Sequence, residues 1–269
     1  MLIAQISDLH IKRFGKLAYR HVDTAAALEK AVAALNALTP APDLILATGD
    51  LVDEGSDEEY GRLRDLLAPL RAPVYVLPGN HDERAAMRRA FPQTPEWNGF
   101  IQYTLEDWPV RIVVADTIIP GKTGGTLCRA RLDWLDETLA QLPDRPTIVA
   151  LHHPPLKTGI ALMDPLGLDD PAPLAAVLQK HGQVERLLCG HVHRPIQARF
   201  AGTIMSVCPS PAHQMPLEFE LAPQPGVIVE PPGYQLHRWA DGVLVTHTAV
   251  IGDYGPQVPI YGKNGEFLG

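Results

Sequence analysis

The chain has 269 residues, of which 46% are hydrophobic and 20% charged, and its formal net charge is −8. This length is sufficient for one large α/β domain with a sizeable core and a smaller appendage. The acidic balance argues against a nucleic-acid groove or an anionic membrane surface as the main partner, because both require clustered Lys and Arg.

The first two thirds of the chain alternate short β-rich runs with helical stretches. The start, MLIAQISDLH, lacks the basic segment, apolar stretch and cleavage site of a signal peptide, and no apolar run approaches the ~20 residues of a membrane span. We therefore expect a cytoplasmic protein that begins with a strand. The alternation favours a layered α/β architecture. Strands are predicted at 2–7, 43–48, 74–77, 111–116, 147–151 and 186–189.

Helices are predicted between these strands. An Ala-rich helix over 24–38 follows Asp23, which is its expected N-cap. Ser56, with Glu59 three residues later, forms a capping box that opens a helix running to about Leu67. Two further helices are predicted over 131–142 and 173–181.

After about residue 195, frequent prolines interrupt any long helix. Two extended runs, 234–239 and 243–250, are joined by Ala240, Asp241 and Gly242, which is a strong hairpin signal. We expect a catalytic domain over 1–196, a β-rich cap or dimerisation element over 197–258, and a tail over 259–269 that returns to the main body.

The three cysteines do not indicate a disulfide framework or a thiolate metal site. Cys128, Cys189 and Cys208 are odd in number and have no C-x-x-C spacing. They are interpreted as small core residues. A nucleophilic Cys128 stays open as an alternative, although no local signature supports it.

Side chains that can bind metals follow five of the predicted strands. In open α/β folds the carboxyl ends of the strands face one crevice, so residues far apart in sequence converge there. The sequence therefore predicts one cluster built from five strand ends. Its members are Asp8 and His10, Asp50, Asn80 with His81 and Asp82, His152 and His153, and His191 and His193.

Each of these pieces has a simpler structural interpretation when it is taken alone. An Asp after Gly49 is more often a turn or a helix cap, and His152 and His153 can be one core and one surface histidine. His191 and His193 are more suggestive, because residues two apart in an extended segment point to the same side. A purely structural role for these residues becomes less convincing when all five motifs occur in order at the predicted strand ends.

The donor types suit a pair of divalent metal ions. Two ions ~3.5–4 Å apart need a bridging carboxylate, and Asp50 is the natural bridge. Imidazole and carboxylate donors favour iron, manganese, cobalt or zinc over calcium or magnesium. Asn80 offers an amide oxygen without adding charge. Such ions would polarise phosphoryl oxygens and lower the pKa of a bound water, so that hydroxide is the expected nucleophile.

His81 is the best candidate for a catalytic residue that does not bind metal. It could stabilise the transition state or protonate the leaving alkoxide if it reaches hydrogen-bond distance. The alternative is a histidine that only orients a ligand. Asp82 is the more natural choice for that orienting role.

Five sequence strings carry a resemblance to a known family. They are SDLH (7–10), GDLVDEG (49–55), GNHD (79–82), HHPP (152–155) and GHVH (190–193). In order, residue type and spacing they resemble the signature blocks of the calcineurin-like metallophosphoesterases. Within that superfamily the chain is similar to the class III cyclic nucleotide phosphodiesterases, and most of all to the bacterial glycerophosphodiesterases. The closer similarity extends through 19–23, the helix around Trp134 and Leu135, and 211–216.

The resemblance implies a four-layer α/β/β/α sandwich and a set of residue roles. One ion would be held by Asp8, His10 and His193, the other by Asn80, His152 and His191, and Asp50 would bridge them. Asn80 and His81 would contact the phosphate, His213 would reach in from the cap, and Tyr19, His21 and Thr123 would shape the pocket. His21 occupies a position where the glycerophosphodiesterases carry an aromatic residue, and the cysteine pair of some of them has no counterpart here.

The leading functional hypothesis is hydrolysis of small phosphodiesters, such as glycerophosphodiesters, by in-line attack of metal-bound hydroxide. A 3′,5′-cyclic nucleotide phosphodiesterase is the closest alternative, because substrate specificity depends on loop contacts that the ligand motifs do not report. A phosphomonoesterase is a weaker alternative, and a non-catalytic interaction scaffold a remote one. A homodimer, or a higher oligomer built from dimers, is the expected assembly.

Overall fold

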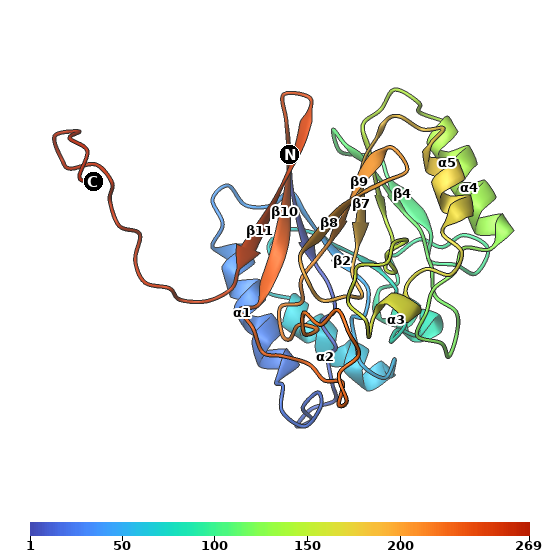
Figure 1. Ribbon diagram of the computed structural model, residues 1–269, viewed down its shortest axis with the longest axis horizontal. Helices are drawn as coiled ribbons and strands as arrows, with labels where there is room; N and C mark the ends of the chain where they lie inside the picture. Colours follow the sequence, from blue (N-terminus) through green and yellow to red (C-terminus); the bar gives the residue numbers. More distant parts are fainter.

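Two β-sheets form the centre of the molecule in a computed structural model that describes residues 1–269 (Figure 1). The first sheet has five strands in the order β11-β10-β1-β2-β3. β1, β2 and β3 are parallel, whereas β10 and β11 form an antiparallel hairpin paired with β1. The strands are β1 (Leu2–Ile6), β2 (Leu44–Thr48), β3 (Val74–Leu77), β10 (Gly233–Ala240) and β11 (Val243–Val250).

The second sheet has six strands in the order β4-β5-β6-β7-β9-β8. Its four inner strands are parallel, and an antiparallel strand lies at each edge. The strands are β4 (Tyr103–Leu105), β5 (Arg111–Val114), β6 (Thr147–Ala150), β7 (Val184–Cys189), β8 (Ile196–Phe200) and β9 (Thr203–Val207).

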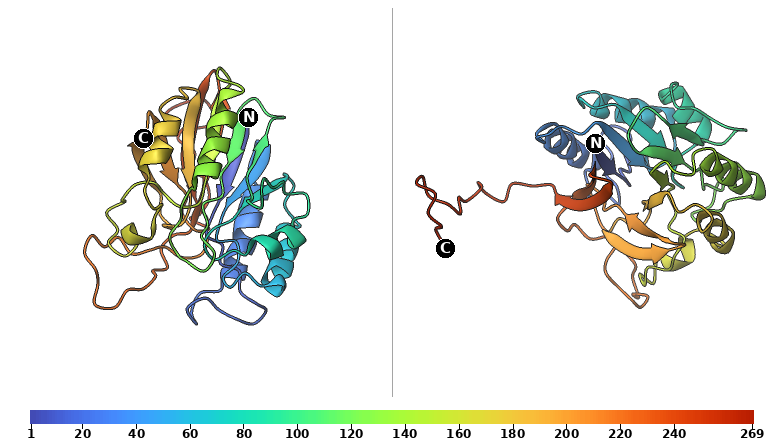
Figure 2. Two further views of the ribbon diagram at one scale, coloured as in Figure 1. Left: turned by 90° about the vertical axis from the view of Figure 1, so that its right-hand side faces the viewer. Right: turned by 90° about the horizontal axis from the view of Figure 1, so that it is seen from above.

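Helices cover the outer faces of the two sheets (Figure 2). Apolar side chains of three helices join the core cluster of the first sheet, and those of two others join the cluster on the second sheet. The four-layer arrangement expected from the resemblance is therefore confirmed. None of the helices combines the length and the apolar character needed to cross a bilayer. The helices are α1 (Thr24–Asn36), α2 (Asp57–Leu67), α3 (Arg84–Ala90), α4 (Arg129–Ala140) and α5 (Ala172–Leu178), with one 3₁₀ turn at Asp164–Leu166.

Strand alternation divides the core into two clusters. Successive side chains of a strand point to opposite faces of its sheet. In β5, Ile112 and Val114 therefore pack between the sheets, whereas Val113 packs against the outer cluster that contains Leu135 of α4. All four side chains are fully buried, which stabilises the fold by roughly 1.5–3 kcal/mol for each of them.

The two helix starts predicted from capping residues are confirmed. Ser56 and Glu59 form a reciprocal capping box at the start of α2, and the Asp23 carboxylate accepts a hydrogen bond from the backbone N–H of Ala26 at the start of α1. In the hairpin, Asp241 and Gly242 both adopt positive φ, as a tight two-residue turn requires.

Four elements were not predicted from the sequence: α3, β4, β8 and β9. α3 has seven residues, of which only Ala86 and Met87 are buried, so it lacks a long apolar stripe. β4 has three residues, and β8 lies at a sheet edge with Gln197 and Arg199 exposed. α3, β4 and β8 therefore bury too few side chains to give a periodic signal, whereas β9 is an inner strand with four of its five residues buried.

Residues 197–258 differ from the expected separate cap. β8, β9, β10 and β11 instead complete the two central sheets. β9 pairs with the free edge of β7, and β10 pairs with the free edge of β1, so the hydrogen-bonding groups of both edges are satisfied. The long connection over 208–232, between β9 and β10, has no helix or strand, and neither have residues 251–258.

The C-terminal tail also differs from its expected return to the main body. Beyond Ile251 the chain extends away from the sheets (Figure 1), and at its tip Leu268 N donates to Ile260 O at 2.9 Å. Gly252, Gly255, Pro256 and Pro259 lie along it and disfavour both helix and strand. We call residues 252–269 the C-terminal arm.

Candidate metal centre

The five predicted strand ends meet at one site. The loops after β1, β2 and β3 come from the first sheet, and those after β6 and β7 come from the second. Close contacts join these loops: the backbone N–H of His191 donates to the Asp8 carboxylate at 2.9 Å, and the His152 ring approaches Asp50 at 3.4 Å. The site therefore lies across the interface between the two sheets.

The backbone at this site is strained. Eleven non-glycine residues of the chain have positive φ, and five of them are Asp8, His10, Asp50, His191 and His193. Such conformations cost of order 1–3 kcal/mol each and gather at functional sites, where the surrounding structure enforces them. The conformations that direct these five side chains therefore lower the stability of the fold.

Two glycines allow the loops to approach this closely. A Cβ atom on Gly49, whose φ is +91°, would lie 2.4 Å from Nδ1 of His152. A Cβ atom on Gly79 would lie 2.3 Å from the backbone nitrogen of Asp50. A larger residue at either position would separate the strand ends.

One group of donors consists of Asp8, His10, Asp50 and His193. Nε2 of His10 lies 3.2 Å from Nε2 of His193 and 3.6 Å from Oδ2 of Asp50. Nε2 of His193 lies 3.4 Å from Oδ1 of Asp8. Their ligand atoms lie within 4.8 Å of one another, and all four residues are buried.

A second buried group contains His152, His153 and His191, whose ligand atoms lie within 4.8 Å of one another, with Asp50 3.4 Å from His152. Oδ1 of Asn80, Nε2 of His152 and both ring nitrogens of His191 are buried and have no hydrogen-bond partner. Leaving a buried polar atom unsatisfied costs about 1–3 kcal/mol. Divalent cations would satisfy these orphaned donor atoms, so the residues fit a metal centre.

Burial keeps the His191 and His193 rings neutral, which is the form that binds metal ions, whereas for His152 the nearby Asp50 carboxylate outweighs burial and raises the pKa to about 9. Burial lowers the pKa of His193 to about 3, and it holds the pKa of His191 well below the ordinary value. Burial alone would raise the pKa of Asp50, but the neighbouring His152 ring holds that pKa well below its ordinary value. The carboxylate that contacts both groups is therefore ionised.

The outer ring nitrogens of three histidines are fixed by oxygen acceptors. Nδ1 of His152 donates to the Thr48 carbonyl at 2.8 Å, and Nδ1 of His193 donates to the His213 carbonyl at 3.1 Å. Nδ1 of His10 lies 3.2 Å from Oδ1 of Asp53. In the neutral form of each ring, this contact places the proton on Nδ1 and leaves Nε2, the nitrogen facing the centre, with a free lone pair.

Asp82 holds two of the ligand loops together, in keeping with its expected orienting role. Its Oδ2 accepts hydrogen bonds from the backbone N–H groups of Leu51 and Gly79, and its Oδ1 accepts one from the Tyr60 hydroxyl at 2.7 Å. Asp82 thereby fixes the loop after β2 relative to the loop after β3.

His81 lies beside the two groups and is partly accessible. Its side chain is 34% exposed, its ring packs edge-on against His10, and its backbone N–H donates to Oδ1 of Asp50 at 2.9 Å. Nδ1 of His81 donates to the Asp53 carbonyl at 2.8 Å. Nε2 is therefore the ring nitrogen left for a bound substrate.

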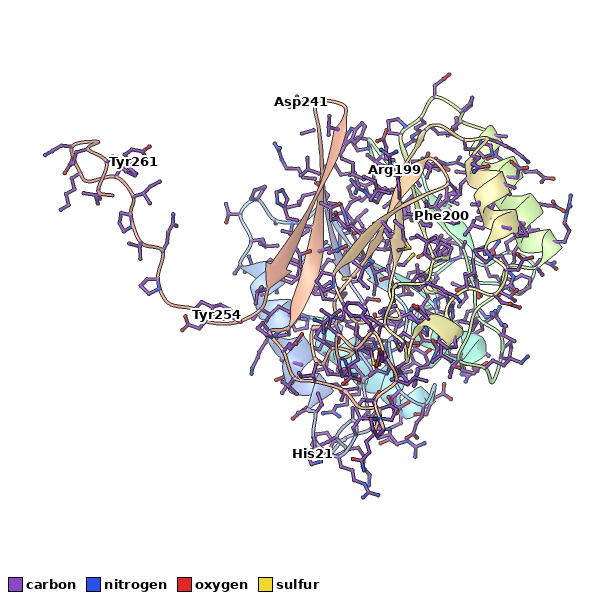
Figure 3. All side chains as sticks on the ribbon, in the orientation of Figure 1. His21, Arg199, Phe200, Asp241, Tyr254 and Tyr261 are labelled. Carbon is purple, nitrogen blue, oxygen red and sulfur yellow. The ribbon has the colours of Figure 1, made fainter.

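The pocket residues suggested by the resemblance occupy different places. His213 is buried, and its ring centroid lies 4.7 Å from that of His193. The Tyr19 ring packs edge-on against His213, with 5.2 Å between the ring centroids. Thr123 reaches the site through its carbonyl, which accepts from Nε2 of His153 at 3.1 Å. His21 is exposed at the edge of the molecule (Figure 3) and makes no ring contact with the cluster.

The sequence interpretation missed Asp53, and it placed His153 in the cluster without assigning it a contact. Asp53 lies within GDLVDEG, and its position three residues after Asp50 is a signal that could have identified it. His153 is buried, with Nδ1 2.7 Å from the Thr117 hydroxyl oxygen and its ring 4.7 Å from His191. Cys189 and Cys208 are buried core thiols as predicted, but the prediction was wrong for Cys128, which is exposed at the start of α4 and contacts Arg131.

A family model described as "Calcineurin-like phosphoesterase" matches residues 1–195. The matched region contains the five strand-end strings and all seven proposed ligands. Members of this family use a dinuclear divalent metal centre, and the two donor groups around Asp50 are consistent with one.

Relatives with closely matching sequences carry phosphodiesterase names. The chain is 39% identical to a probable glycerophosphodiester phosphodiesterase GpdQ of Arcobacter nitrofigilis over 100% of both chains. It is 38% identical to a 3′,5′-cyclic adenosine monophosphate phosphodiesterase CpdA of Pseudomonas aeruginosa, over 72% of this chain and 70% of that one. In fold it resembles a dimetal phosphatase of Danio rerio, with a TM-score of 0.70, 15% identity, and 93% and 98% of the two chains covered.

Proposed function

This chain belongs to the calcineurin-like phosphoesterase family and is a phosphodiester hydrolase, and we propose that glycerophosphodiesters are its preferred substrates. The observation that carries the hydrolase chemistry is the pair of buried donor groups that share Asp50. The full-length similarity to GpdQ supports the substrate class, because it includes the loops outside residues 1–195.

We assign the ligands as two sets around one bridge. Asp8, His10 and His193 would hold one divalent ion, Asn80, His152 and His191 the other, and Asp50 both. The imidazole and carboxylate donors suit iron, manganese, cobalt or zinc. Bound there, two such ions would polarise the phosphoryl oxygens and make a water acidic enough to serve as hydroxide near neutral pH.

The other residues of the site would bind the substrate and move a proton. When Oδ1 of Asn80 binds a metal ion, its amide N–H groups would remain free to donate to a phosphoryl oxygen. His81, held through Nδ1, would donate a proton from Nε2 to the leaving alkoxide. His213 would approach the phosphate beside His193, with Tyr19 packed against it. We do not assign a substrate contact to His21, and Thr123 would shape the pocket wall through the His153 contact.

The assigned chemistry predicts turnover of a generic phosphodiester. Purified protein loaded with Mn²⁺ or Co²⁺ should release p-nitrophenolate from bis(p-nitrophenyl) phosphate, because the centre requires only a phosphodiester and a good leaving group. Metal content should approach two ions per chain by elemental analysis, whereas a non-catalytic scaffold would carry far fewer. Turnover no faster than in the metal-only control, across several metals, would contradict the proposal.

A comparison of natural substrates distinguishes the two phosphodiesterase classes. We expect kcat/KM for glycerophosphoethanolamine to exceed that for cyclic AMP at least about tenfold, which corresponds to about 1.4 kcal/mol in transition-state binding. The reverse order would favour a cyclic nucleotide phosphodiesterase, a function that the similarity to CpdA keeps as the second candidate.

We also propose that the protein works as a homodimer and in the cytoplasm. Tyr254, Val258 and Ile260 on the C-terminal arm are more than 60% exposed, and β11 offers a free sheet edge with Val243 and Val245 exposed. An exposed apolar arm beside an unpaired edge favours contact with a second copy. Three free thiols are typical of a reducing compartment.

Removal of the arm tests the proposed dimer. A chain that ends at Asp253 should behave as a monomer in size-exclusion chromatography with light scattering, whereas the full chain should show twice its 29.4 kDa mass. As a control of equal length, Val258 and Ile260 should be changed to Ser, which removes the apolar contacts alone. A truncated chain that remains dimeric would contradict the role of the arm.

A further inference from the structure

Asp53 connects two residues of the proposed centre through different atoms. Its side chain, which is 19% exposed, places Oδ1 3.2 Å from Nδ1 of His10. Its backbone carbonyl accepts the hydrogen bond from Nδ1 of His81 at 2.8 Å. One residue therefore contacts a proposed ligand with its side chain and accepts the hydrogen bond of a proposed proton donor with its main chain, while its Oδ1 lies farther from Nδ1 of His81, at 3.9 Å.

The position of Asp53 is itself fixed by neighbouring groups. Nζ of Lys12 donates to Oδ2 of Asp53 at 2.6 Å and to Oε1 of Glu54 at 2.7 Å. The backbone N–H of Asp53 donates to the Ile11 carbonyl, which joins the loop after β2 to the loop after β1. The ion pair with the Lys12 ammonium engages Oδ2 and leaves Oδ1 for His10.

An ionised carboxylate can only accept hydrogen bonds, so the contact requires a proton on Nδ1 of His10. Nε2, which lies near Asp50 and His193, then has a free lone pair. The corresponding outer nitrogens of His152 and His193 donate to backbone carbonyls, which mutation does not remove. Among these three rings, only that of His10 depends on a side chain for its orientation and tautomer.

We propose that Asp53 is a positioning residue whose side chain orients the His10 ring and selects its Nδ1–H tautomer for metal binding, while its carbonyl, the nearer acceptor for Nδ1 of His81, sets the orientation of that ring. This proposal rests on the assignment of His10 as a ligand. It predicts that the side chain governs metal affinity and that the main chain governs the proton donor, so a side-chain variant should separate the two effects.

The test combines Co²⁺ binding with the tautomer of His10. In isothermal titration of metal-free protein with Co²⁺, Asp53→Ala should weaken one of the two binding events about 10- to 100-fold, the usual effect of losing a residue that orients a metal ligand. At saturating Co²⁺ its kcat should fall far less than that of His81→Ala. Long-range ¹H–¹⁵N spectra of the metal-free protein, with the His10 signals assigned from His10→Gln, should show the Nδ1–H tautomer in the wild type and its loss in Asp53→Ala.

Glu54 provides a matched control, because it accepts from the same Lys12 ammonium but does not touch His10. Glu54→Gln should bind Co²⁺ within about twofold of the wild type, and Asp53→Asn, which keeps an acceptor oxygen, should recover most of the affinity. If Asp53→Ala does not fold, Asp53→Ser should be used instead, because its side chain is too short to reach His10. We expect the same loss of Co²⁺ affinity and of the Nδ1–H tautomer in that variant.

Equal losses of affinity in Glu54→Gln and Asp53→Ala would overturn the proposal, and so would an unchanged His10 tautomer in Asp53→Ala. If the wild-type protein bound no Co²⁺, the proposed function would fail instead. The spectra of the metal-free protein would then decide the role of Asp53 on their own.

Discussion

Asp50→Ala is expected to abolish both metal binding and activity. Asp50 is the one carboxylate that lies within 4 Å of a histidine ring nitrogen of each donor group, at 3.6 Å from His10 and 3.4 Å from His152. Without it, two adjacent cations would repel each other with no shared anion between them. Loss of one preorganised charge-stabilising group typically lowers kcat about 10²- to 10³-fold, so loss of both ions should lower kcat/KM by more than about 10³-fold.

Elemental analysis and bis(p-nitrophenyl) phosphate turnover, measured on the same sample, test this expectation. Asp65→Ala is a suitable control, because it removes an exposed carboxylate from α2 and should leave both readouts unchanged. Circular dichroism should show that Asp50→Ala remains folded. Two ions per chain in folded Asp50→Ala would refute the bridging assignment.

His81→Ala is expected to give the opposite combination: metal content retained and turnover lost. The His81 side chain is partly exposed, and Nδ1 is engaged by the Asp53 carbonyl, so Nε2 is free to act on the substrate. Removal of a positioned proton donor lowers kcat by roughly 10²- to 10⁴-fold. The effect should be on kcat, with the number of bound ions unchanged.

The leaving group supplies a second measurement for His81. A donor to the leaving alkoxide matters most when that alkoxide is a strong base, so the variant should lose more activity on glycerophosphoethanolamine than on bis(p-nitrophenyl) phosphate. His247→Ala, an exposed histidine of β11, serves as the control. Equal losses on both substrates would argue against proton donation, and loss of metal would argue that His81 is a ligand.

Much of the site could be predicted from the sequence, because its chemistry is concentrated at strand ends. The β-rich runs before Asp8, Asp50 and Asn80 are local signals, and parallel strands necessarily present their carboxyl ends at one edge. Helix caps such as Ser56 and the turn at Asp241 and Gly242 are equally local, since they depend on residues within three positions of each other.

The role of Asp53 and the place of His153 could not be predicted in the same way. Asp53 reaches His10 across 43 positions, and His153 packs its ring against His191 across the two sheets. The sequence contains both residues within recognisable strings. These sequence motifs do not show which neighbouring atom Asp53 or His153 faces, because that depends on the positive-φ loops that carry His10 and His191.

The sequence by itself determined the donor types, their order and the strands that precede them, because these follow from local hydrophobic pattern and turn chemistry. Only the tertiary structure decided that β8–β11 complete the two central sheets, that the C-terminal arm leaves the body, and that Asp50 contacts both donor groups. Such features depend on which strand edges remain unpaired and how two sheets pack, and these long-range contacts leave no periodic signal along the chain.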